Sequence, residues 1–228
     1  KKHRLDLMSA LSRWLKPSRT VPTTSWSASG SMWKAKPKTI FYLMLGNWLY
    51  GTGEAILIKA DIGQSPGTVL AQGIQNLTGD TIGWTSFYIS IGVMFLWIPL
   101  KNKVGIGTVL NIIFVSVAID VMMPFFPSPD SYAVSVVMVL IGILVIGLGS
   151  AFYIPSNLGP GPRDGLMTGF QRVTGLPIAW VRAMLEIAVI SIGWTLGGSI
   201  GLATLIFAFG IGPAVSFGLY CISATSKN

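Results

Sequence analysis

The residues best suited to bind a solute lie where Gly and Pro interrupt an apolar run. Residues 157–165 read Asn-Leu-Gly-Pro-Gly-Pro-Arg-Asp-Gly. Pro160 cannot continue a helix because it lacks a backbone N–H, whereas Pro162 suits the first position of a new helix. We therefore predict a short helix that begins at Pro162. Its free N–H groups, together with the guanidinium of Arg163, favour an anion or a dipole.

This second break supplies most of the predicted solute-binding residues, which are Gly159, Gly161, Arg163 and Asp164. The short helix ends before Gly175, so it is too short to span a bilayer and is expected to be re-entrant or interfacial. A structural interpretation competes with this one. It treats the break as a turn in which Asp164 caps the helix and pairs with Arg163 or Arg182.

An earlier break, residues 61–68, has the same Gly/Pro plan with milder chemistry. Gly67 and Thr68 stand where the second break has Arg163 and Asp164. We predict an asymmetric binding site, to which the first break contributes Gly63, Ser65 and Thr68.

Three charged residues within apolar segments are predicted to couple proton or charge movement, namely Glu54, Arg182 and Glu186. Charges at membrane depth are costly and usually face other helices. Arg182 and Glu186 are four residues apart and can pair on one helical face, so a structural ion pair is the alternative. Glu54 has no obvious local partner and is the best candidate for a titrating group, with a purely structural role as its alternative. Asn47 and Asn111 are expected to join helices.

The two breaks belong to a duplication. Residues 51–123 align without a gap on residues 147–219, an offset of 96, and the shared residues are mostly Gly, Pro, Thr and Trp. Each copy has three long apolar runs. Because three is odd, the copies must cross the bilayer in opposite senses, which predicts an inverted repeat.

Composition places the chain in a membrane. Of 228 residues, 51% are hydrophobic and 11% charged, and the mean hydropathy is +0.65. We predict an all-α integral membrane protein with six transmembrane helices in two inverted three-helix repeats, each with a short re-entrant or interfacial half-helix. The expected spans are residues 39–59, 82–100, 104–124, 133–155, 178–197 and 200–222. The expected domains are a tail at 1–38, repeats at 39–124 and 133–222, a linker at 125–132 and a C-terminal tail at 223–228.

Positive charge is concentrated in residues 1–38, which hold nine Lys and Arg against one acidic residue, Asp6. This tail predicts attraction to anionic lipid, and residues 3–16 form a candidate amphipathic surface helix. With the tail in the cytoplasm, Lys101 and Lys103 also fall inside, and the linker at 125–132 falls outside. Both termini are therefore expected in the cytoplasm, and nucleic acid is not an expected partner.

Two counts exclude several classes of chemistry. His3 is the only histidine and Cys221 the only cysteine. The membrane segments therefore offer no histidine cluster for a metal and no Ser-His-Asp triad, so we expect no cofactor and no enzymatic activity.

The segment GLGSAFYIPSNLGPGPRDGLMTGFQRVTG, followed by Val181-Arg182 and Glu186, resembles the bacterial YczE/YitT-type membrane proteins. The resemblance covers residues 45–220, and the GPRDGLM stretch is its most specific part. It implies a multi-pass protein of the bacterial inner membrane and gives no substrate. Family members often carry Trp-Asp where this chain has Gly67-Thr68.

These observations predict a transporter-like or channel-like protein for a small solute with anionic character. In this hypothesis, Arg163 and the half-helix N-termini bind the solute, and Glu54 couples protonation to a gate. The alternative is a non-transporting accessory subunit that binds and stabilises a larger membrane complex. Purification with a large complex would favour the accessory subunit, whereas a stable isolated monomer or homodimer would favour transport.

Overall fold

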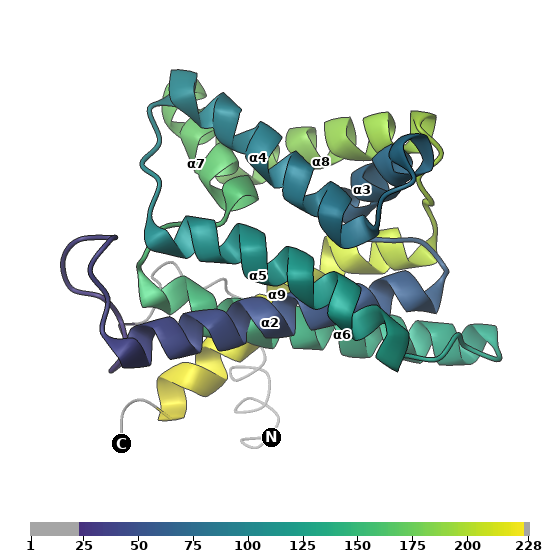
Figure 1. Ribbon diagram of the computed structural model, residues 1–228, viewed down its shortest axis with the longest axis horizontal. Coiled ribbons are helices and arrows are strands. Elements are labelled where there is room, and N and C mark those ends of the chain that lie inside the picture. The colour runs from purple at the N-terminus through teal and green to yellow at the C-terminus, as the bar shows by residue number, and fades with distance from the viewer. Residues whose placement is uncertain (1–22, 226–228) are drawn as a thin grey trace, which may run out of the picture.

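The computed structural model describes residues 23–225, within which all regular structure is helical (Figure 1). The candidate amphipathic helix at 3–16 lies outside the described residues. The long helices are α2 (Pro37–Ala60), α4 (Ile82–Leu100), α5 (Ile106–Met122), α6 (Tyr132–Tyr153), α8 (Ile178–Thr195) and α9 (Leu202–Thr225). The shorter elements are α3 (Pro66–Thr78), α7 (Pro162–Thr174) and the 3₁₀ turns η1 (Met123–Phe125) and η2 (Ile154–Ser156).

Five helical segments in the described part of the chain are long and apolar enough to cross a membrane. They are α4, α5 with η1, α6 with η2, α8 and α9. The prediction of an all-α membrane protein is confirmed at this level. Helix α2 is long enough as well, at 24 residues, but it carries Asn47 and Glu54 and falls outside the apolar set.

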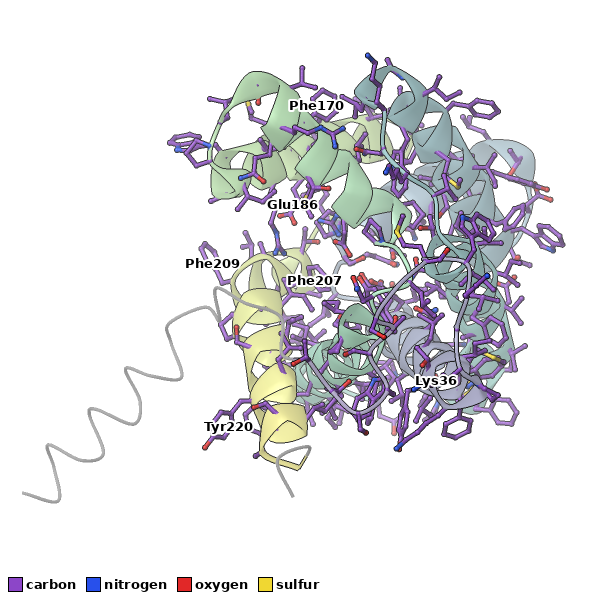
Figure 2. The ribbon with its side chains drawn as sticks, turned by 90° about the vertical axis from the view of Figure 1, so that its left-hand side faces the viewer. Lys36, Phe170, Glu186, Phe207, Phe209 and Tyr220 are labelled. Atoms are coloured by element: carbon purple, nitrogen blue, oxygen red, sulfur yellow. The ribbon has the colours of Figure 1, made fainter. Side chains whose placement is uncertain are left out.

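The helices form two layers (Figure 1). One layer holds α2, α5, α6 and α9, and the other holds α3, α4, α7 and α8. Helix α2 packs between α5 and α6, which explains how it can carry polar residues: both Asn47 and Glu54 are buried against protein. Helix α9, in contrast, carries an exposed apolar residue on its outer surface. Phe207 is turned inward, whereas Phe209 is 82% exposed on the outside (Figure 2).

The duplication is visible in the element boundaries. Helices α3, α4 and α5 begin at Pro66, Ile82 and Ile106, and their counterparts α7, α8 and α9 each begin 96 residues later. Contacts between segments follow the same correspondence. Helix α3 packs against α8 of the second copy, and α7 packs against α4 of the first.

Glycines bring the first helices of the two copies, α2 and α6, into close contact. A Cβ added at Gly46 would lie 2.6 Å from the carbonyl oxygen of Gly149, and one at Gly149 would lie 2.6 Å from that of Gly46. Gly53 meets Gly142 in the same reciprocal way further along. Since Gly46 pairs with the later glycine and Gly53 with the earlier one, α2 and α6 run antiparallel. Only residues without a side chain let two helices approach this closely.

Both breaks have the same backbone. Asp61 (φ 53°) caps the C-terminus of α2, and Asn157 (φ 55°) caps η2, which follows α6. Asp and Asn are the residues, after glycine, that best tolerate this left-handed conformation. Two residues later the chain turns at Gly63 (φ 107°) and Gly159 (φ 113°), positions that require glycine.

The short helices follow at once, as predicted. Helix α7 begins at Pro162 and ends before Gly175 (φ 70°), and α3 begins at Pro66 and ends before Gly79 (φ 77°). Each has 13 residues. At 1.5 Å per residue this is roughly 20 Å, less than the thickness of a bilayer core.

Each break is held by the first turn of a helix from the other copy. The N–H of Gly107 in α5 donates to the carbonyl of Leu158 at 2.8 Å, and the N–H of Ala203 in α9 donates to that of Ile62 at 2.9 Å. These bonds satisfy backbone groups that a broken helix would otherwise leave unpaired away from water.

Candidate functional site

Glu54 is the charged residue at the centre of the first break. It lies less than two turns before the end of α2, and the chain then folds back so that α3 starts beside it. The hydroxyls of Ser65 and Thr68 donate to Glu54 Oε2 at 2.9 and 2.8 Å, and lie 3.0 Å from each other. All three side chains are at most 5% exposed. The sequence predicted Ser65 and Thr68 as solute-binding residues and Glu54 as a coupling residue, but not that the two hydroxyls bind the carboxylate.

Ser65 has a second role, which explains why it stands at this position. It is the N-cap of α3, and its hydroxyl oxygen lies 3.4 Å from the N–H of Thr68. A serine at this position satisfies one free N–H of the first helical turn. The cap thereby holds its own hydroxyl, and that of Thr68 one turn later, against Glu54.

At the second break, two arginines share one carboxylate. Arg163 Nη2 lies 2.5 Å from Glu186 Oε1, and Arg182 Nε donates to the same oxygen at 2.9 Å. The predicted pairing of Arg182 with Glu186 is therefore confirmed. The alternative in which Asp164 pairs with Arg163 or Arg182 is wrong. Asp164 Oδ2 instead accepts a hydrogen bond from the hydroxyl of Tyr153 in α6, since Glu186 already engages both guanidinium groups.

The two breaks face a common interior. The ring of Tyr50 in α2 meets that of Tyr153 edge to face, with centroids 6.5 Å apart. The Tyr153 hydroxyl in turn donates to Asp164 of the second break. Figure 2 shows Glu186 pointing inward from α8 toward the other layer. We call the set formed by Tyr50, Glu54, Ser65, Thr68, Tyr153, Arg163, Asp164, Arg182 and Glu186 the central cluster.

Tyr50 and Tyr153 were not among the residues predicted from the sequence. A signal was present for one of them, because Asn47, Tyr50 and Glu54 are spaced three and four residues apart and share one face of α2. The expectation that Asn47 joins helices is confirmed. The Asn111 side-chain amide of α5 donates to Asn47 Oδ1 at 2.8 Å, and Asn47 is completely buried.

The predicted glycines surround the cluster as packing residues. A Cβ at Gly63 would stand 2.5 Å from the backbone of Gly201, and one at Gly159 would stand 2.8 Å from the hydroxyl of Thr108. One at Gly161 would stand 3.1 Å from the side-chain oxygen of Asn111. Their lack of side chains lets the breaks fit against α5 and α9.

Three relatives extend along most of the chain. An uncharacterized protein of Haemophilus influenzae is 42% identical over 208 residues, covering 91% of this chain and 95% of its own. The uncharacterized membrane protein YczE of Bacillus subtilis is 30% identical over 182 residues, with 79% and 84% covered. The uncharacterized protein YyaS of the same species is 25% identical over 170 residues, with 72% and 84% covered. No solved structure matches the chain.

The family model described as a family of unknown function, DUF6198, matches residues 37–219. This range begins with α2, contains both breaks and the whole central cluster, and ends within α9. The resemblance to YczE-type proteins is thereby confirmed, and the chain belongs to the DUF6198 family of YczE-like membrane proteins.

Proposed function

We propose that the chain is a transporter-like or channel-like membrane protein for a small polar solute. In this proposal α2 joins the five apolar segments as a sixth span, and the six spans form two inverted three-helix repeats. The antiparallel contact of α2 with α6 supports the inversion, as do the two breaks, which lie at opposite ends of the layer that contains α2 (Figure 1). Broken helices that meet at an inverted-repeat interface are typical of transporter binding sites.

The observation that carries the proposal is the environment of Glu54. Glu54 is 5% exposed, and within residues 23–225 its carboxylate accepts hydrogen bonds from the neutral hydroxyls of Ser65 and Thr68. An intramembrane carboxylate held by neutral groups is expensive to keep charged and marks proton or solute pathways. Hydroxyls suit such a site because each can donate to the ionised form and accept from the protonated form. We therefore assign coupling to Glu54.

The second break supplies the groups for an anionic part of the solute. Arg163 and Arg182 place two positive charges around the single carboxylate of Glu186, and the side chain of Arg163 is 36% exposed. An anionic group would compete with Glu186 for Arg163, at the N-terminus of α7 where a negative charge is favoured. Asp164 and the Tyr153 hydroxyl then border the same site.

The membrane placement follows the distribution of basic residues. We propose the bacterial inner membrane, with both termini in the cytoplasm and the basic tail at 1–38 near anionic lipid. The turn that carries Lys101 and Lys103 then faces the cytoplasm, and the linker at 125–132 faces outward.

Solute uptake into proteoliposomes tests the function. The full chain would be reconstituted with an outward or inward proton gradient and offered a panel of labelled small anions and zwitterions. Uptake above that of empty vesicles is expected for the wild type, with a loss to background in Glu54→Gln and Arg163→Ala. The matched control is Lys103→Met, an exposed residue outside the cluster. Wild-type uptake that survives both substitutions would overturn the site.

The accessory-subunit alternative makes a different prediction. It requires that the chain co-purify with a larger membrane complex in mild detergent and show no uptake alone. A chain that purifies as an isolated monomer or homodimer and transports a solute excludes it.

A further inference from the structure

The segment before α2, residues 23–35, crosses the end of the second break, and we call it the strap (dark purple in Figure 1). It contains no helix or strand and is tied to the break by its backbone. The N–H of Ala28 donates to the carbonyl of Ser156 at 3.0 Å, and Asn157 Nδ2 donates back to the carbonyl of Ala28 at 3.1 Å. The strap therefore covers the point where η2 ends and the break begins.

Two further contacts hold the strap on either side of this point. On one side, the ring of Trp26 stacks on that of Tyr42 in α2, with centroids 4.3 Å apart, and lies 6.4 Å from the ring of Phe152 in α6. On the other side, the carbonyl of Met32 accepts from the N–H of Ile106, the first residue of α5, at 3.1 Å. The strap thus joins the ends of three helices that belong to both copies.

The strap lies directly over the central cluster. Ala28 and Ala35 pack against a group of buried residues that includes Tyr153 and Leu158, which are 6% and 0% exposed. Tyr153 is the residue that donates to Asp164. A solute that approached Asp164 from this end would therefore have to displace the strap.

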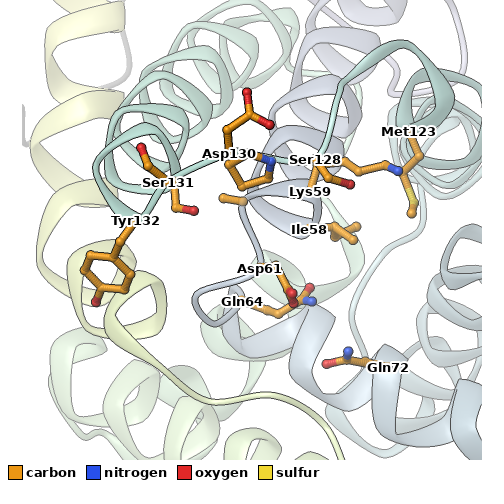
Figure 3. Close-up of a pocket in the computed structure, with 13 residues that line it drawn as sticks. Ile58, Lys59, Asp61, Gln64, Gln72, Met123, Ser128, Asp130, Ser131 and Tyr132 are labelled. Atoms are coloured by element: carbon orange, nitrogen blue, oxygen red, sulfur yellow. The ribbon is translucent and has the colours of Figure 1, made fainter.

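The opposite end of the molecule has the same plan but is open. The linker before α6, residues 126–131, stands in the second copy where the strap stands in the first. A cavity of about 550 Å³ separates it from the end of α2, with Asp130 and Ser131 on one side and Asp61 and Gln64 on the other (Figure 3). In the part of the chain that the structure describes, no hydrogen bond joins the linker to the last turn of α2 or to the first break. One end is sealed by the strap, whereas the other is not sealed by the linker.

The seated strap leaves two polar atoms without partners. Trp26 Nε1 and Ser156 Oγ are both buried, and neither has a hydrogen-bond partner among the described residues. A buried polar atom without a partner costs free energy, and water would satisfy both atoms once the strap lifted. This gain would offset part of the cost of separating the strap from the helices.

We propose that the strap is a gate, which lifts as a unit from η2 and opens the central cluster toward that end of the molecule. With the strap seated and the linker apart from α2, the structure is closed at one end and open at the other, as alternating access at an inverted repeat requires. The gate rests on the proposed transport function, because a structural protein has no need to open this end. Its movement is nevertheless measurable without any solute.

The test measures how fast a maleimide modifies a thiol beneath the strap, in the full chain in detergent with Cys221→Ser as background. The reporters are Ser156→Cys, which replaces a hydroxyl that has no partner among the described residues, and Leu158→Cys. Trp26→Ala is expected to speed the labelling of both by at least about tenfold, because the labelling of a buried thiol follows the equilibrium of local opening.

Three controls make the result decisive. Trp33→Ala removes an indole from the same strap, but one that is 58% exposed, and should leave both rates unchanged. Ser116→Cys is buried in α5 away from the strap and should stay protected in the Trp26→Ala protein. Thermal unfolding confirms that each variant is folded.

Three outcomes would overturn the gate. They are no acceleration in Trp26→Ala, acceleration at Ser156→Cys alone, which indicates only a hole left by the indole, and equal acceleration at Ser116→Cys, which indicates general loosening. Because labelling uses no solute, a failed uptake assay with accelerated labelling refutes transport and leaves the movement of the strap in place.

Discussion

The two breaks have one backbone and two chemistries. Both turn at a glycine with φ above 100°, both lead into a 13-residue helix, and both are held by a helix from the opposite copy. In the first break the buried carboxylate of Glu54 is bound by hydroxyls, and a cavity that Glu54 does not line opens at the end of α2. In the second break an arginine is bound by a carboxylate, and the N-terminal segment covers the end. The two copies therefore share their backbone geometry, while different side chains give the two breaks different chemistry.

Packing shows the same division. The backbone of Val69 and Leu70 in α3 lies against Gly193 of α8, whereas the positions that correspond to Val69 and Gly193 are Gly165 in α7 and Trp97 in α4. A Cβ at Gly165 would stand 2.0 Å from the Trp97 ring, and one at Gly193 would stand 2.7 Å from the backbone of Val69. The interface of α3 with α8 is therefore formed here by backbone against a glycine, and that of α7 with α4 by an indole ring against a glycine.

The largest effect is expected from labelling that reports on which side of the membrane each break lies. In a Cys221→Ser background, Asp61→Cys and Asn157→Cys place one thiol at each break, where both native side chains are exposed. An impermeant maleimide applied to intact cells is expected to label the first and leave the second unlabelled until the membrane is opened. Lys103→Cys serves as the control for the cytoplasmic side. Labelling of both breaks from the same side would contradict the inverted repeat.

The close contact between the Trp97 ring and Gly165 predicts a large loss of stability when the ring is removed. Its ring is 1% exposed and its Nε1 donates to the carbonyl of Pro162 at 3.0 Å. Trp97→Ala should lower the free energy of unfolding by about 3–5 kcal/mol, as expected for the cavity that an indole leaves. Gly165→Ala should destabilise the wild type because of the close ring, but not the Trp97→Ala protein. Thermal unfolding of the four proteins in detergent measures the coupling, and additive effects would refute the contact between Trp97 and Gly165.

The glycines at the two turns should respond alike, because they belong to the shared backbone. Gly63→Ala and Gly159→Ala are each expected to cost about 2–4 kcal/mol, from a positive φ and from contact with the opposite copy. Gly67→Ala is the matched control, since nothing lies within 4 Å of its Cβ position. Thermal unfolding that drops at only one of the two turns would show that the copies do not share this geometry.

The smallest effect is expected from the hydroxyls, which belong to the first break alone. Thr68→Val should cost about 1.5–3 kcal/mol, because it removes a hydrogen bond to a buried carboxylate. The cost should shrink in the Glu54→Gln background, where the acceptor is neutral. The difference in unfolding free energy between the two backgrounds, obtained from a double-mutant cycle, is the measurement. Equal costs in both would mean that Thr68 does not act through Glu54.

Local sequence patterns were enough to predict that the chain is an all-α membrane protein and where its short helices begin and end. Apolar runs indicated the membrane helices, and Pro162 and Gly175 set the boundaries of α7 because proline and left-handed glycine act through their own backbone. The pairing of Arg182 with Glu186 was also predictable, since four residues of helix place the two side chains on one face. Because the two copies align without a gap, the boundaries predicted for one copy also predicted those of the other.

Contacts between separate segments were decided only when the chain folded. Glu54 meets Ser65 and Thr68 because the turn at the first break folds α3 back onto α2. Asp164 is bound by Tyr153 rather than by an arginine because Glu186, on another helix, engages both guanidinium groups. The spacing of these residues in the sequence predicts neither set of contacts. The physical reason is that a side chain bonds to whatever the packing of distant helices brings within about 3 Å, and local pattern carries no such distance.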